Sequence, residues 1–200
     1  MEKLEAVNYC MKMLGSPPVG DLESLHPSVT ACITEVNTAK RTIQKEGWWF
    51  NKEYSHELIP DTNGDINLPL FVLEATVTNQ AGVVKRGQKL YDTVNNTYQF
   101  NQRLYVNYIV DLDWELLDET VQDTIQYFAA MMICENTLED SLKANAQAKL
   151  YTKSLSDMKK THLRTQRRNI INSPRSARAR GRVRPYASRS STRNPNIPGG

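Results

Sequence analysis

The stretch Gly47-Trp48-Trp49-Phe50-Asn51 marks the point where the hydrophobic period of the sequence changes. Before it, apolar residues recur at spacings of three and four, as in an amphipathic helix; after it, they alternate with polar residues, as in a β-strand. Glycine ends a helix in the left-handed conformation at little steric cost, so a helix end is predicted at Gly47. The aromatic side chains that follow carry large apolar areas. We therefore expect this stretch to hold a helical layer against a sheet.

Two helices are predicted before this junction. The first spans residues 2–14 and ends at Gly15, beyond which Pro17-Pro18 cannot continue it. The second spans residues 28–46 and contains neither glycine nor proline. Its apolar stripe, which predicts a buried face, consists of Val29, Cys32, Val36, Ala39 and Ile43.

Short antiparallel strands are predicted from the junction to about residue 112. Turn signals at Asn63-Gly64, Ala81-Gly82 and Asn95-Asn96 divide this region at hairpin-like spacings. Residues 104–110 are rich in aromatic and β-branched side chains and form the clearest strand. We expect about four to six strands, because hairpin spacing argues against βαβ units.

Helical periodicity returns near residue 118 and is expected to break at Asn136-Thr137. The apolar stripe of this third helix is predicted from Val121, Ile125, Phe128 and Met132. A fourth helix is expected over residues 138–167. Its stripe is narrow, as in a coiled coil, and comprises Ala144, Ala148, Tyr151, Leu155, Met158 and His162.

The order of these elements predicts an α+β fold. We expect an antiparallel helical bundle of about four helices with an inserted antiparallel β-domain and an extended basic C-terminal tail. The predicted parts are a helical pair in residues 1–47, a β-rich insertion in 48–113, a second helical pair in 114–167 and an Arg-rich extended tail in 168–200.

The net charge of +3 conceals two regions of opposite charge. Residues 164–200 hold ten arginines and no acidic residue, which leaves 15 basic and 22 acidic side chains, a net charge of −7, in residues 1–163. A block of like charge at a chain end is typical of an interaction arm. The residues of this arm that we expect to bind a partner are Arg175, Arg178, Arg180, Arg182, Arg184 and Tyr186.

Three interpretations of the arm stay open. It binds the phosphate groups of a nucleic acid, with a steep dependence on salt. It docks on an acidic protein surface, such as that of a neighbouring copy. It is a solvated tail without a partner. The absence of lysine from residues 164–200 favours planar, bidentate contacts, which suit phosphate and carboxylate equally.

The aromatic junction also has two interpretations, as core and as interface. Adjacent residues of a strand point to opposite faces, so Trp48 and Trp49 could not both enter one core from a strand. We therefore expect one tryptophan inside the subunit and the other, beside Phe50, at a seam with a neighbouring subunit or layer. Exposed tryptophan is typical of subunit contacts.

No motif for catalysis or cofactor binding is present in the sequence, which lacks GxGxxG, Walker-type GK[ST] and GxSxG patterns. His26, His56 and His162 fall in different predicted elements, so no metal site is expected. We therefore expect a protein that is not an enzyme and holds no cofactor.

Other polar and apolar patterns have plain structural interpretations. The acidic run Asp111, Asp113 and Glu115 is interpreted as carboxylates at a helix start. The cysteines are far apart in the sequence, which suits buried thiols in a reducing compartment. No window approaches the length of unbroken apolar sequence that a membrane-spanning helix needs.

Several short segments share their order and spacing with a known family. They are Ala6-Val7-Asn8, Leu14-Gly15-Ser16-Pro17-Pro18-Val19, Gly47-Trp48-Trp49-Phe50-Asn51, Leu58-Ile59-Pro60-Asp61, Leu68-Pro69, Leu117-Asp118-Glu119, Val121-Gln122-Asp123 and Ala129-Ala130. Together they resemble the tail tubular protein A family, the adaptor (head-to-tail connector) proteins of podovirus-type short-tailed bacteriophages. The resemblance covers roughly residues 4–165.

This resemblance implies a structural virion protein that forms a homo-oligomeric, dodecameric ring. Its implied partners are the portal protein, the tail nozzle protein (tail tubular protein B) and the tail fibre protein, with transient contact to viral DNA in the lumen and none to a membrane. The implied location is the phage tail, after assembly in the host cytoplasm. The alternative function, which the arm alone suggests, is a nucleic-acid-binding regulatory protein.

Overall fold

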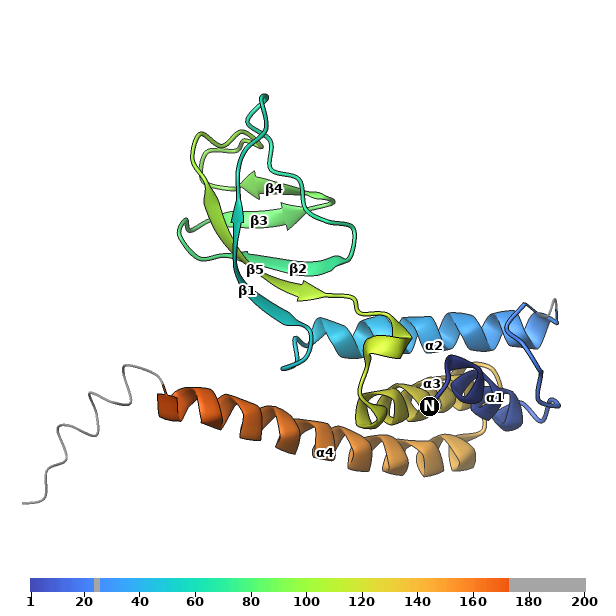
Figure 1. The fold of residues 1–200 in the computed structure, drawn as a ribbon. Coiled ribbons are helices and arrows are strands. Elements are labelled where there is room, and N and C mark those ends of the chain that lie inside the picture. The colour runs from blue at the N-terminus through green and yellow to red at the C-terminus, as the bar shows by residue number, and fades with distance from the viewer. Residues whose placement is uncertain (24–25, 173–200) are drawn as a thin grey trace, which may run out of the picture. The chain divides into compact units, whose positions relative to one another are not determined.

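The computed structural model describes residues 1–23 and 26–172 (Figure 1). Residues Met1–His162 form one compact unit. The elements follow the chain in the order α1 (Lys3–Met13), α2 (Pro27–Lys45), β1 (Lys52–Leu58), β2 (Val72–Val77), β3 (Val83–Arg86), β4 (Lys89–Asp92), β5 (Leu104–Val110), the 3-10 helix η1 (Trp114–Leu116), α3 (Glu119–Asn136) and α4 (Ser141–Asn172). Helices combined with antiparallel sheets make an α+β fold, as the sequence predicts.

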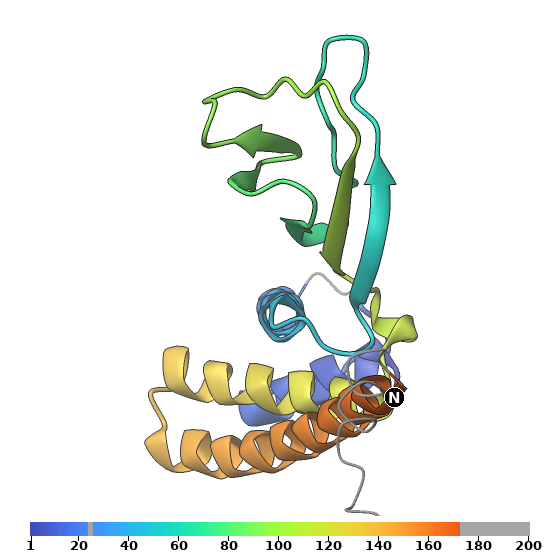
Figure 2. The same cartoon turned by 90° about the vertical axis from the view of Figure 1, so that its left-hand side faces the viewer.

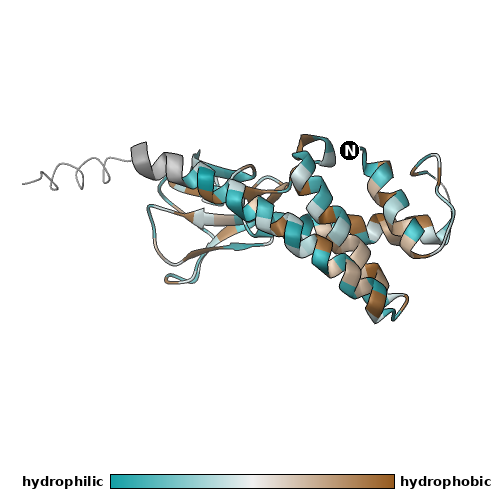
Figure 3. Ribbon diagram, turned by 90° about the horizontal axis from the view of Figure 1, so that it is seen from below, coloured by the Kyte–Doolittle hydropathy of each residue, from teal (hydrophilic) through white to brown (hydrophobic). Residues whose placement is uncertain are grey.

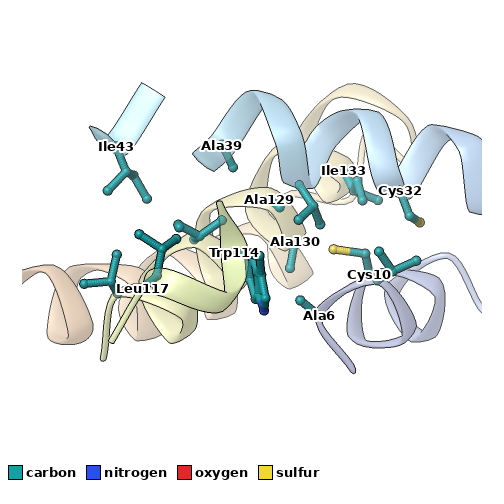
Figure 4. Close-up of a cluster of buried hydrophobic side chains, with 14 of the residues drawn as sticks. Ala6, Cys10, Cys32, Ala39, Ile43, Trp114, Leu117, Ala129, Ala130 and Ile133 are labelled. Carbon is teal, nitrogen blue, oxygen red and sulfur yellow. The ribbon is translucent and has the colours of Figure 1, made fainter. Parts of the chain in front are cut away.

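Helices α1, α2 and α3 bury a common apolar core. The stripe predicted for α2, from Val29 to Ile43, is confirmed, since its residues are at most 3% exposed. Figure 4 shows Cys10 of α1, Cys32 of α2 and Ala130 of α3 gathered in this core. Burial raises the pKa of the Cys10 thiol, and raises that of Cys32 to about 11, so both are neutral packing groups.

Helix α3 buries Val121 and Ile125 as predicted, but the second half of its stripe differs from the prediction. After Ile125, the core positions are Ala129 and Ile133, whereas Phe128 is only half-buried. The prediction followed the bulkiest residues, but a small side chain lets α3 approach its neighbours closely. Phe128 instead packs against Tyr151 of α4, with 5.0 Å between ring centroids.

Helix α4 begins at Ser141, later than predicted, and extends to Asn172. The carboxylate of Asp140 accepts hydrogen bonds from the amides of Leu142 and Lys143 (3.1 and 3.0 Å), so it caps the helix start. The predicted stripe is confirmed as the less exposed side of the helix and comprises Ala144, Ala148, Tyr151, Leu155, Met158 and His162.

Strand β5 occupies the centre of an antiparallel sheet with the order β1-β5-β2. Its bounds match the predicted strand. Alternate residues from Leu104 to Val110 point into a second apolar core, which Ile66 and Leu90 complete. The turn expected at Ala81-Gly82 links strands of different sheets, because β3 pairs with β4 across Gly87-Gln88 and not with β2.

Strand β1 lies at an edge of this sheet and is exposed along most of its length. Figure 2 shows it beside β5, with which it pairs. A bulge between Glu53 and His56 interrupts the pairing, and Ser55 there has a φ of 60°. The ring of His56 stacks on Tyr108, 4.7 Å away between centroids.

The side-chain amide of Asn51 joins the end of α2 to β5. Its Oδ1 accepts a hydrogen bond from the amide of Trp48 (2.8 Å), and its Nδ2 donates to the carbonyls of Gln44 (2.8 Å) and Val110 (3.0 Å). The backbone carbonyl of Asn51 also accepts from the amide of Val110 (3.0 Å). Asn51 is fully buried, so these backbone groups have the Asn51 side chain and not water as their hydrogen-bond partner.

A second buried amide, that of Gln44, extends this joint to the end of β5. Its Oε1 accepts from the amide of Leu112 (2.8 Å), while its Nε2 donates to the carbonyl of Leu112 (3.0 Å) and to Asp111 (3.2 Å). Lys40 forms a 2.9 Å ion pair with Asp111. The interpretation of Asp111 as a helix-start carboxylate is therefore wrong, since η1 begins only at Trp114 and Asp111 holds α2 instead.

Gly47 ends α2 as predicted and does so with a φ of 70°. A Cβ at this position would lie 2.7 Å from Cδ1 of Ile109. Glycine is therefore required twice, for the left-handed backbone and for the close approach of β5.

Replacing Asn51 by Ala should lower the free energy of unfolding by about 3 kcal/mol, because it leaves a buried amide and two buried carbonyls without their partner. Urea denaturation followed by circular dichroism measures this change. The exposed Asn101→Ala is the control and should shift stability by no more than about 0.5 kcal/mol. Equal effects of the two substitutions would contradict the assigned role.

Gly47→Ala should destabilise the protein by about 2 kcal/mol, against about 1 kcal/mol for Gly15→Ala. The two glycines have similar backbone angles (φ 70° and 73°), but a Cβ at residue 15 meets no atom within 4 Å. Urea denaturation gives the destabilisation caused by each substitution. The difference between these two destabilisations isolates the contact of residue 47 with Ile109. Adding Ile109→Val to the Gly47→Ala chain should recover part of that difference.

Candidate assembly surfaces

The aromatic residues of the junction gather on one side of the helical core. Residues 49–51 form a turn, not a strand, so the alternation that was expected to separate Trp48 from Trp49 does not operate. Trp48 is buried, and its Nε1 donates to the carbonyl of Ile43 (2.7 Å). Trp49 is half-buried and packs edge-to-face on Trp48 and Phe50, with centroids 6.4 and 5.1 Å apart. A contact of Trp49 and Phe50 with a neighbouring subunit stays a prediction.

His162 of α4 completes this aromatic group. Its ring lies 5.6 Å from Trp48 and 6.3 Å from Trp49, measured between centroids. Burial, with a smaller contribution from the charge of Lys52, lowers the pKa of the imidazole. The sequence places His162 correctly on the α4 stripe but gives no sign that residues so distant along the chain meet there.

A pocket with a volume of about 1080 Å³ lies between the chain start, η1 and the first turns of α1 and α3. We call it the acidic pocket. Trp114 and Leu117 are buried apolar residues of its lining, and the indole of Trp114 donates to the carbonyl of Met1 (3.1 Å). Five carboxylates line it, against Lys3 and the amino terminus: Glu2, Glu5, Glu115, Glu119 and Asp123.

The electrostatics of this pocket favour a cationic occupant. Asp123 is half-buried, and burial, together with the charge of Glu119, raises the pKa of its carboxyl. The amino terminus acts in the opposite direction on the same group. A cation entering the pocket would relieve the repulsion between these carboxylates. The pocket could not be predicted from the sequence, because its residues come from three separate elements. The one related signal in the sequence is the net charge of −7 in residues 1–163.

A shallow groove of about 590 Å³ runs along α4 and borders the apolar stripe of the helix at Ala148. We call it the α4 groove. Its lining combines small side chains with three lysines and one aspartate: Asn145, Ala148, Lys149, Thr152, Lys153, Ser156, Asp157 and Lys160. Figure 3 shows hydrophilic residues distributed along α4. Lys160 pairs with Asp157 at 2.8 Å.

The predicted arm residues, from Arg175 to Tyr186, lie outside the described part of the chain, so their role stays a prediction. Within residues 1–23 and 26–172, no cluster of three or more His, Cys, Asp or Glu side chains could hold a metal ion. Over the same residues, no helix is both long and apolar enough to cross a membrane.

The free energy of unfolding should decrease as the pH falls below about 6.5, the ordinary pKa of histidine. Below this pH, His162 binds a proton in the unfolded chain. In the folded protein its lowered pKa keeps the imidazole neutral until the pH is lower still. Because the unfolded chain then binds more protons, a falling pH favours unfolding. Urea midpoints measured between pH 5 and 8 should show a smaller slope for His162→Gln than for the original protein. Identical slopes would contradict this assignment.

Comparisons with known proteins found a family model and a relative that match most of this chain. A family model described as "Tube: Tail tubular protein" matches residues 4–172. Tail tubular protein A of Klebsiella phage KP34 is 30% identical over 172 residues, which cover 84% of this chain and 90% of that protein. The match includes the helices, the sheets and the joint between them. The chain therefore belongs to the tail tubular protein family.

Proposed function

We propose that this protein is the adaptor subunit of a short phage tail, which forms a ring between the portal and the tail nozzle. The match of residues 4–172 to the tail tubular protein family carries the proposal, because it spans nearly the whole described chain. As a member of that family, the protein is a structural component of the tail. The adaptor position, the ring and the passage of DNA through it are the parts that we propose.

The joint at Asn51 supports a structural role. A helical layer tied to a sheet by buried hydrogen bonds resists separation of the two parts, which suits a structural component. Gln44 and the pair of Lys40 with Asp111 extend the same joint to the end of β5. In the proposed arrangement, the helices build the ring and the β-part meets the next layer of the tail.

The positive charge of the arm is a second feature that fits the proposed adaptor role. Ten arginines without an acidic residue suit either an acidic surface of the portal or of a neighbouring adaptor, or the phosphates of DNA in the lumen. An acidic body suits a conduit, because a negative wall repels DNA and lets it slide.

The test is to mix the purified protein with the portal protein of the same phage. Mass measurement and electron microscopy should show a ring docked on the portal, and a chain ending at residue 172 should dock more weakly. Docking that survives this truncation, combined with loss of packaged DNA from particles, would assign the arm to DNA. A stable monomer that leaves the portal bare and binds duplex DNA with a steep salt dependence would overturn the adaptor role in favour of nucleic-acid regulation.

A further inference from the structure

We propose that the α4 groove of one copy docks on the acidic pocket of the next copy, and that this contact closes the ring. The inference rests on the proposed ring function and names the surfaces that build it. The occupant of the pocket is therefore a second copy of this chain, which presents the outward side of α4.

The first argument is charge. The pocket offers five carboxylates against one lysine and the amino terminus, whereas the α4 groove offers three lysines and one aspartate. Lys149, Lys153 and Lys160 stand at spacings of four and seven, so they share one face of the helix. All three are exposed. Opposite charges arranged on two surfaces in this way steer encounter and fix the register of a complex.

The second argument is direction. Tyr151 and Met158 face the protein's own core, and each is followed two residues later by a lysine of the groove, at 153 and 160. Two residues correspond to a rotation of about 200° around a helix, so these lysines point away from that core. The lysines of the groove consequently face away from the core of their own chain.

The third argument is shape. The pocket is concave, and a helix is convex. Thr152 and Ser156 are small and exposed, so they let another backbone come close to α4 while the neighbouring lysines extend beyond them toward carboxylates. The pocket lining includes Trp114 and Leu117, which are buried in the helical core.

The fourth argument is symmetry. The two surfaces lie on different elements, so each copy can give one contact and receive another. Such a head-to-tail interface closes into a ring when the rotation between neighbours allows it. An interface that used the same surface twice would stop at a dimer, which does not suit the proposed ring.

The test uses two full-length variants with reversed charge. One is Lys149→Glu with Lys153→Glu on α4, and the other is Glu115→Lys with Glu119→Lys at the pocket; all four positions are exposed. Each variant alone should lose self-association by at least about tenfold, because like charges then face each other. An equimolar mixture should regain it, because every contact between the two variants is again between opposite charges. Sedimentation velocity measures association, and circular dichroism verifies folding.

Control variants carry equal changes of charge at exposed positions elsewhere. Lys12→Glu with Lys45→Glu matches the α4 variant, and Glu23→Lys with Glu135→Lys matches the pocket variant. Both controls should associate like the original protein. A chain carrying both reversals on α4 and at the pocket should assemble with itself and exclude the original chain.

The same variants are then supplied from plasmids to cells infected by a phage that lacks this gene. Either reversed variant alone should reduce infectious particles strongly, and the two together should restore them. If each variant alone supports growth as well as the original chain, the inference is overturned while the ring function stands. If the pocket variant and the chain ending at residue 172 fail but the α4 variant does not, then the arm occupies the acidic pocket in place of α4. That result also overturns the inference. If the original chain itself restores no tails, the proposed function fails.

Discussion

The hydrogen bonds of the Asn51 side chain are the constraint on which the rest of the structure depends. One amide joins the turn after α2, the last residues of α2 and the end of β5, and it does so without access to water. A buried polar group of this kind is costly unless every partner is in place, so it permits a single arrangement of the chain. The helical core and the sheet core are separate apolar clusters, and this amide, with Gln44, links them.

The same constraint explains why aromatic residues crowd at the junction. The turn that Asn51 stabilises places Trp48 and Trp49 on the helical core, where α4 covers them through His162. Helix α4 has a narrow apolar stripe, so it contributes to the core along one side and leaves the other side to polar residues. A helix of this kind can belong to its own subunit and to an assembly at once. The carboxylates of Glu2 and Glu5 at the chain start lie outside the core of α1 and form the capping box of that helix.

Local patterns in the sequence were sufficient for most of the fold. The end of α2 at Gly47, the buried stripe of α2 and strand β5 followed from period and residue type alone. The errors arose where contacts distant along the chain decide. Ala129 displaced Phe128 from the core of α3, and Asp111 pairs with Lys40 instead of starting a helix. The acidic pocket draws on three elements, so no window of sequence could reveal it.

The bulge in β1 has a consequence for the solubility of the free chain. An edge strand with regular pairing offers its open side to any other strand and is a starting point for aggregation. Ser55, held at a φ of 60°, breaks the regular spacing of amides and carbonyls along β1. Such a break makes an edge a poor template for uncontrolled stacking. The free chain is in this way less prone to aggregate through β1.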